Sequence, residues 1–167
     1  MKVEFLREEA VQFLNLYNLF SERIENRAAF LLANGDVDVD ADNILLHEAK
    51  KQKYNASILA NYKIPNTIRN AYLELRVKEI MGLDIVIIDS PDSSINGVAC
   101  PACNYVVFET KETGFFEICP VCSWQNDGCD SQEVSSANRT TMEEYIKTKT
   151  FEDAVTSVSV ASMYKRK

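Results

Sequence analysis

Four cysteines in two Cys-Pro-x-Cys motifs carry the clearest chemical signal in this sequence. Cys100 and Cys103 form the first motif, and Cys119 and Cys122 form the second, with fifteen residues between the motifs. Zinc prefers four ligands at tetrahedral corners, and a Cys-x-x-Cys turn supplies two thiolates from one tight bend. The spacing therefore predicts that two such bends face each other and bind one shared Zn²⁺ through all four cysteines.

A site made of four thiolates leaves no coordination position open for water or substrate. It therefore indicates a structural metal rather than a catalytic one. Two other interpretations stay open: iron can occupy the same geometry, and Cys-x-x-Cys pairs can act as redox dithiols. Two disulfides would require an oxidising compartment. We interpret the fifth cysteine, Cys129, as a bystander rather than a ligand or nucleophile.

The composition narrows the functional classes. The chain has 167 residues, 46% of them hydrophobic, with a formal net charge of −7. This charge opposes nucleic-acid binding as the main activity, because contact with phosphates requires clustered Lys and Arg. No apolar run approaches the ~20 residues of a membrane span. Charges in the first nine residues interrupt any signal-peptide pattern, so we expect a cytoplasmic protein whose thiols stay reduced.

The N-terminal half reads as mainly helical. Apolar residues at steps of three and four predict a long helix over 3–33 that ends at Asn34-Gly35. A second helix is predicted over 43–62 and a third over 66–81, with Gly82 as its stop. The β-branched residues at 83–89 predict one buried strand.

The C-terminal half reads as a metal-binding hairpin followed by short helices. Two strands are predicted at 105–108 and 115–118, around a turn at 111–114, with both cysteine pairs at the open end of this hairpin. Capping boxes at Thr140–Glu143 and Thr150–Asp153 predict helices over 141–148 and 151–163. The expected fold class is α+β: a helical part with one strand at 1–90, a linker at 91–97, and a zinc-ribbon-like module with C-terminal helices at 98–167.

Alternating acids precede the second predicted helix, at Asp36, Asp38, Asp40 and Asp42. They resemble the start of a calcium-binding loop. The comparison fails because Ala41 stands where the loop needs glycine and His47 where it needs a bidentate carboxylate. We interpret the segment as a solvated acidic turn. A further hypothesis makes these four acids an anionic surface that meets a basic partner.

Around its cysteines the chain resembles the bacterial cysteine-rich CPCC family. The resemblance rests on Cys100 to Tyr105, on Phe116 to Gly128 including Trp124, and on Ser136 to Asn138. The family pattern has a third cysteine inside the first motif, a glycine after that motif and two acids after the tryptophan. Ala102, Asn104, Gln125 and Asn126 occupy these positions here.

The resemblance implies a metal-stabilised cytoplasmic fold, and some proteins with this module look like immunity proteins that neutralise a toxin from a rival cell. Our leading hypothesis is therefore a zinc-stabilised immunity protein, not an enzyme, whose partner is a cognate toxin, with a nuclease as the candidate activity. Nuclease toxins are commonly basic, which fits an acidic inhibitor. The alternatives are a zinc-ribbon adaptor associated with nucleic acid and a redox enzyme.

Overall fold

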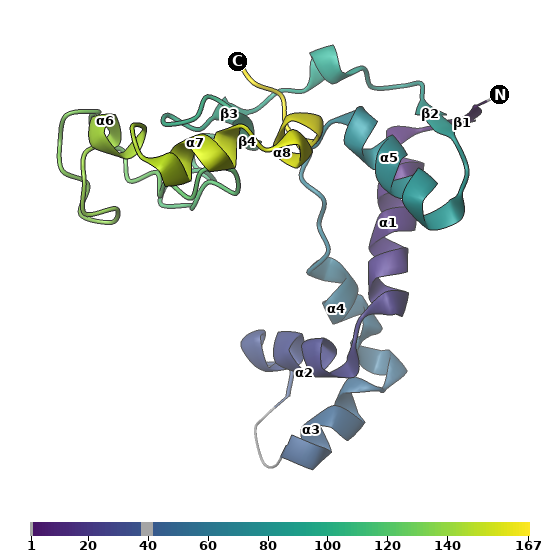
Figure 1. The fold of residues 1–167 in the computed structure, drawn as a ribbon. Coiled ribbons are helices and arrows are strands. Elements are labelled where there is room, and N and C mark those ends of the chain that lie inside the picture. The colour runs from purple at the N-terminus through teal and green to yellow at the C-terminus, as the bar shows by residue number, and fades with distance from the viewer. Residues whose placement is uncertain (1, 38–41) are drawn as a thin grey trace. The chain divides into compact units, whose positions relative to one another are not determined.

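The computed structural model describes residues 2–37 and 42–167 (Figure 1). It divides into two compact units. The first, here called the metal unit, combines the residues up to Arg7 with Pro65–Lys167. The second, the helical unit, is Glu8–Ile64. The helical unit is thus inserted in the sequence between the first strand of the metal unit and the rest of that unit.

The helical unit consists of short helices around a small apolar core. Its elements are α1 (Arg7–Ser21, of which Arg7 belongs to the metal unit), α2 (Ile24–Ala33), α3 (Asp42–Ala49), η1 (Gln52–Tyr54) and α4 (Asn55–Ala60). The buried members of the core are Leu19, Ala28, Leu31, Ala49 and Ile58. They come from four different helices, so the core rather than any single helix holds this unit together.

The single long helix predicted over 3–33 is wrong. Residues Val3–Phe5 form strand β1, and the helix is interrupted between α1 and α2, where Arg23 is extended at φ −68° and ψ 147°. The Glu22 carboxylate accepts hydrogen bonds from the Arg23 amide and the Asn26 side chain. These side-chain hydrogen bonds offer the Arg23 amide an alternative to the helical bond, so the helix can be interrupted here. The predicted end at Asn34-Gly35 is confirmed, with Gly35 at φ 71°.

The helix predicted over 43–62 is also broken, into α3, η1 and α4. The break lies at Lys51, which is extended at φ −75° and ψ 137°. Arg27 spans this break, because its guanidinium donates to the Ala49 carbonyl at 3.0 Å and to the Asn55 side chain at 2.6 Å. A cation therefore satisfies a carbonyl at the C-terminal end of α3, which lets the chain turn there.

In the metal unit, β1 pairs in parallel with β2 (Ile85–Ile87), in the register Val3 to Ile85. The strand predicted at 83–89 is confirmed in this shorter form. Helix α5 (Asn70–Met81) contacts β2 and ends, as predicted, at the left-handed Gly82 (φ 67°). It begins four residues later than predicted, because Asp92 accepts from the Asn70 amide at 2.7 Å and caps the helix from a distant loop.

The predicted linker at 91–97 lies inside the metal unit, and Asp92–Ser94 form the 3-10 helix η2. Asp92 also pairs with Arg69 at 2.9 Å. A Cβ atom added to Gly97 would come within 2.7 Å of the Phe108 carbonyl oxygen and 2.9 Å of Thr67. The end of this segment is therefore a packed loop. The proposed division into domains at 1–90 and 98–167 stays a prediction.

The cysteine-bearing region contains one short hairpin, in which β3 (Val98–Ala99) pairs antiparallel with β4 (Val106–Phe108). The predicted pairing of 105–108 with 115–118 is wrong: β4 pairs with β3, and Ile118 makes only an isolated bridge to Gln125. Three helices follow: α6 (Met142–Tyr145), α7 (Lys149–Val155) and α8 (Val158–Met163). The α+β fold class is confirmed.

The predicted capping boxes are displaced. Thr141 and Thr148 are the residues that cap α6 and α7, and each accepts a backbone hydrogen bond through its side chain. The helix predicted over 151–163 is divided between α7 and α8, because Thr156 and Ser157 lie between them. Threonines stand at 140, 141, 148 and 150, so the sequence pattern alone offered several competing caps.

The last residues of the chain return to the cysteine-bearing hairpin. The Val106 amide donates to the Lys165 carbonyl at 2.8 Å, and the Lys167 amide donates to the Asn104 carbonyl at 2.9 Å. The Arg69 amide donates to the Met163 carbonyl at 3.0 Å. Residues 163–167 therefore join the start of α5 to the first cysteine motif. Among the described residues, no helix is both long enough and apolar enough to cross a membrane.

Candidate metal centre

Each cysteine pair lies on a tight bend, here called a knuckle, and the two knuckles have the same backbone hydrogen bonds. In the first, the Cys100 amide donates to the Tyr105 carbonyl and the Asn104 amide donates to the Cys100 carbonyl, both at 2.9 Å. In the second, Cys119 donates to Trp124 and Ser123 donates to Cys119, again both at 2.9 Å. The two Cys-Pro-x-Cys sequences therefore fold into two copies of one local structure.

The residue after each pair has left-handed backbone, with φ 61° at Asn104 and φ 62° at Ser123. This conformation turns the chain back on itself, so that the amide of the fifth residue can donate to the carbonyl of the first cysteine. Left-handed backbone costs a non-glycine residue roughly 1–2 kcal/mol, and asparagine adopts it more readily than serine. The knuckles therefore form against a local cost that the surrounding hydrogen bonds must offset, and a bound metal would help to offset it.

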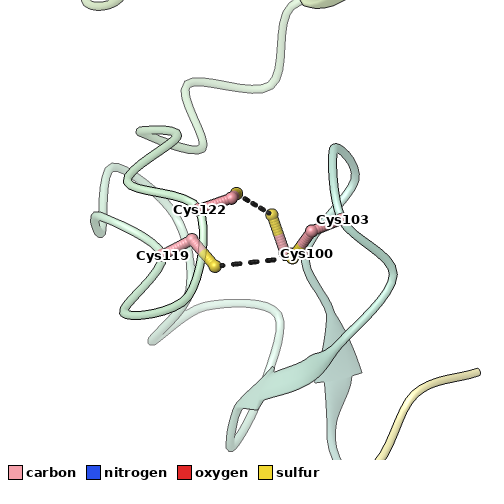
Figure 2. Close-up of side chains that lie close together, drawn as sticks. All are labelled: Cys100, Cys103, Cys119 and Cys122. Atoms are coloured by element: carbon pink, nitrogen blue, oxygen red, sulfur yellow. Dashed lines mark hydrogen bonds between the residues drawn. The ribbon is translucent and has the colours of Figure 1, made fainter. Parts of the chain in front are cut away.

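The four cysteine side chains point toward one another from the two knuckles (Figure 2). The Sγ atoms of Cys100 and Cys122 lie 3.6 Å apart, and those of Cys103 and Cys119 lie 3.7 Å apart. All four sulfur atoms lie within 4.8 Å of one another. A tetrahedron with zinc–sulfur distances of roughly 2.3 Å has edges of about 3.8 Å. The spacing therefore fits a single tetrahedral ion.

The four sulfurs are also closed off from water, because all four residues are at most 1% exposed. Hydrogen bonds from the Cys103, Cys119 and Cys122 thiols lower the pKa of Cys100. The matching contacts with its neighbours raise the pKa of Cys122, because a second thiolate beside the first is repelled. Deprotonation of all four buried thiols requires a cation, because neighbouring thiolates repel one another and have no water around them. This charge balance suits a divalent metal ion.

Aromatic packing supports the second knuckle. Trp124 is 1% exposed, and its ring centroid lies 5.2 Å from that of Tyr145 on α6. The Tyr145 hydroxyl donates to the Cys122 carbonyl, and its ring packs edge-on against Phe151 on α7 at 5.8 Å. The short helices α6 and α7 therefore brace the ligand-bearing bend, although they contribute no ligand.

A polar network that reaches Gln125, the residue after Trp124, was not predicted from the sequence. The Ser135 hydroxyl donates to the Asp127 carboxylate at 2.6 Å and accepts from the Asn138 amide at 2.9 Å. The Asn138 side chain in turn exchanges two 2.9 Å hydrogen bonds with the backbone of Gln125. The bond from Ser135 lowers the pKa of Asp127. Sequence spacing could not reveal this network, because the bonds from Ser135 to Asp127 and from Asn138 to Gln125 span eight and thirteen residues of irregular chain.

The structure thus brings together the four cysteines predicted as metal ligands: Cys100, Cys103, Cys119 and Cys122. Cys129 is not part of this group, and burial together with hydrogen bonding to Asp127 raises its pKa, which keeps the thiol protonated. Of the acids predicted to meet a partner, Asp36 is exposed and Asp42 begins α3. Asp38 and Asp40 lie outside the described residues.

Comparison with known proteins agrees with this geometry. Residues 98–153, which are 56 of the 167, match the model of the family described as Cysteine-rich CPCC. No curated protein matches the chain, and no solved structure does. The matched range contains both knuckles, the bracing helix α6 and most of α7. Residues 98–153 therefore form a cysteine-rich CPCC domain with a buried four-cysteine cluster that can hold a metal ion.

Proposed function

We propose that this chain is a zinc-stabilised immunity protein: it binds a toxin delivered into the cytoplasm and blocks it, and it catalyses no reaction itself. The observation that carries the proposal is the closure of the metal centre. The four buried thiolates would occupy all four coordination positions of a tetrahedral ion, so neither water nor substrate could bind to the metal. The metal then serves to hold the two knuckles together, and function rests on the surface of the protein.

Zinc is the ion that best suits this donor set. Four thiolates in tetrahedral array select zinc or iron among the common divalent metals. The two metals can be distinguished by colour and by elemental analysis, because tetrathiolate iron absorbs visible light and tetrathiolate zinc does not. Elemental analysis of the purified chain should find one zinc per chain and no iron. A coloured protein with one iron per chain would contradict the assignment.

The charge of the chain supports a basic partner. A formal net charge of −7 favours electrostatic attraction to basic proteins, raising both association rate and specificity. Toxins that act on nucleic acid have a basic surface, because their substrate is anionic. The acids Asp36, Asp38, Asp40 and Asp42 are candidate contacts for such a partner.

The product of the neighbouring gene is the natural partner to test. We expect it to be toxic when expressed alone, harmless when expressed together with this chain, and to co-purify with it in a defined stoichiometry. The control is the same toxin expressed with an unrelated acidic protein of similar size. A neighbouring product that is neither toxic nor bound by this chain would remove the proposal.

One observation favours a second candidate, an adaptor associated with nucleic acid. One cavity of about 470 Å³ is lined by three cationic side chains, by two tyrosines and by one acid that pairs with Arg69; these residues are Arg69, Lys165, Arg166, Tyr105, Tyr164 and Asp92. A basic cavity with aromatic walls suits stacked bases and phosphates. This candidate predicts binding to RNA or DNA that weakens steeply with added salt. The absence of any gel shift at low salt would exclude it.

A further inference from the structure

An exposed aromatic cluster lies directly before the second knuckle. Phe115 and Phe116 are each 53% exposed, and Ile118 is 59% exposed. The two phenylalanine rings pack edge-to-face with centroids 4.5 Å apart. We call these three residues the knuckle patch. Single exposed apolar residues are ordinary on protein surfaces, but adjoining aromatic residues that remain exposed mark sites of contact with other molecules.

The backbone of the knuckle patch is strained and held in place. Phe116 has φ 62°, which is an unusual conformation for a bulky aromatic residue. Its amide donates to the Asn126 carbonyl at 2.8 Å, and its carbonyl accepts from the Gln125 side chain at 2.9 Å. Strain of this kind persists only where surrounding bonds impose it, and it is concentrated at functional sites.

Further bonds fix the chain on either side of the patch. The Asn126 side chain donates to the Gly114 carbonyl at 2.9 Å, and the Asn126 amide donates to the Glu117 carbonyl at 3.0 Å. A Cβ on Gly114 would lie 2.8 Å from the Phe108 ring, so this glycine permits close packing under the patch. Gln125 and Asn126 follow Trp124, which is buried next to the metal ligands. The metal centre thus presents the aromatic pair on a preorganised base, which reduces the entropy lost on binding.

Acidic residues surround the patch in the sequence. Between residues 109 and 138 the chain has six acidic residues and one basic residue, Lys111. Four of these acids are exposed: Glu112, Glu117, Asp130 and Glu133. We call these four acids, which flank the patch in the sequence, the acidic rim. Their charge repels nucleic acid and a second copy of the same surface, and it attracts a partner rich in lysine and arginine. An apolar centre with a charged rim is the arrangement of protein-binding surfaces.

We propose that the knuckle patch with its acidic rim is a docking surface for a protein partner that presents apolar side chains surrounded by lysine and arginine. Where the proposed function holds, this partner is the toxin, so that identification rests on the immunity role. The aromatic pair supplies the anchoring contacts, because buried aromatic residues carry much of the binding energy at protein interfaces. The acids steer the partner and set its orientation.

Selection of peptides tests this surface before the partner itself has been identified. A random peptide library displayed on phage is selected against the full zinc-loaded chain. We expect enrichment of peptides that combine lysine or arginine with large apolar residues. Enriched peptides without basic residues, or the absence of enrichment, would overturn the proposal.

Matched variants of the full chain locate the binding. The double variant Phe115→Ser/Phe116→Ser should weaken the selected peptides by more than about tenfold. Phe20→Ser serves as the control, because Phe20 is 83% exposed but lies on α1 in the helical unit, and it should leave affinity unchanged. Zinc content and melting temperature confirm that both variants are folded. Equal affinity of the two variants for the peptides would overturn the proposal.

A second pair of variants tests the acidic residues of the surface and leaves the aromatic residues unchanged. Glu112→Gln/Glu117→Gln should slow association about threefold and reduce its dependence on salt. The matched control Glu8→Gln/Glu9→Gln changes the same charge on the helical unit and should have no effect. Identical salt dependence in both pairs would contradict a steering role for the rim.

The outcomes separate this surface from the immunity role. If the peptides bind through the knuckle patch while the neighbouring gene product neither binds nor harms cells, the surface stands and the immunity role fails. If the gene product is neutralised equally by the wild-type chain and by Phe115→Ser/Phe116→Ser, the immunity role stands and the docking surface fails.

Discussion

At each knuckle, the residue after the second cysteine helps to set the positions of both cysteine side chains. The left-handed Asn104 and Ser123 close the bends that place the sulfur atoms, and the hydrogen bonds of both bends are the same. These relations explain why the four-cysteine cluster could be predicted from the sequence. A Cys-x-x-Cys motif determines its own local geometry, and only the pairing of the two motifs depends on the remainder of the fold.

Removing one ligand should release the metal. We expect Cys119→Ser to lower zinc affinity at least ~100-fold, which corresponds to about 3 kcal/mol, or roughly a quarter of the 10–16 kcal/mol typical of structural zinc. Competition with a chromogenic chelator measures this change. Cys129→Ser is the matched control and should keep one zinc per chain, because Cys129 lies outside the cluster. Equal zinc loss in both variants would contradict the assigned ligand set.

Glu22 should make the helical unit sensitive to acid. Hydrogen bonds from Tyr62 and Asn26 lower the pKa of this carboxyl. A lowered pKa adds stability at pH values above that of the unfolded carboxyl, about 4.3, and this stability is lost as the pH falls through the folded value. Glu22→Gln should therefore reduce hydrogen-exchange protection of residues 8–64 at pH 7 and weaken its dependence on pH below ~4.3.

The exposed Glu25, which pairs with Arg23 at 3.4 Å, offers the comparison for this experiment. Glu25→Gln should leave the pH profile close to that of the wild-type chain, because an exposed pair adds little stability. The same flattening of the profile in both variants would refute the role assigned to Glu22.

The bends, helices and strands were predictable to different degrees. The end of the first helical stretch at Gly35, the end of α5 at Gly82 and the strand at 85–87 were all visible, because glycine and β-branched residues have strong local preferences. Strand β1 was read as helix, since its partner β2 lies some eighty residues away in the sequence. The start of α5 depended on Asp92, which no local pattern connects to Asn70.

The hairpin was misassigned for a related reason. Residues 115–118 have the composition of a strand, but the side chains of Gln125 and Asn126 fix their backbone in a different conformation. Tertiary hydrogen bonds here override local propensity. The strained Phe116 could not be inferred from sequence either, because its left-handed backbone contradicts the preference of an aromatic residue.

Glycine at the closing position of a knuckle should stabilise the fold. We expect Ser123→Gly to raise the free energy of unfolding of the zinc-loaded protein by about 0.5–1 kcal/mol, because glycine removes the left-handed strain but loses more entropy on folding. Asn104→Gly should give a smaller gain, because asparagine already tolerates this conformation. Thermal melting of the two variants measures the difference. A loss of stability in Ser123→Gly would show that its side chain contributes more than the strain it causes.

The two compact units should respond differently to loss of the metal. The metal unit includes the four-cysteine cluster, whereas the helical unit has its own apolar core of five buried residues. Metal binding by structural zinc sites contributes on the order of 10–16 kcal/mol, comparable to the entire stability of a small domain. The cluster is therefore expected to decide whether residues 98–153 are folded.

Chelation of the intact, reduced chain tests this expectation. Hydrogen exchange followed by mass spectrometry should show loss of protection in peptides from 98–153 and retained protection in peptides from 8–64. Readdition of zinc should restore the first set. Unchanged protection around the knuckles after complete removal of the metal would mean that the cluster is dispensable for the fold.

The order of the elements has a consequence for biosynthesis. Strand β1 leaves the ribosome well before its partner β2, which emerges only after all of Glu8–Ile64 has been made. The cysteine pairs emerge close together, so zinc can close the knuckles while translation continues. Residues 163–167, which pair with the first knuckle, are synthesised after both cysteine pairs. The nascent protein should therefore be able to bind its metal before residues 163–167 are in place beside the first knuckle.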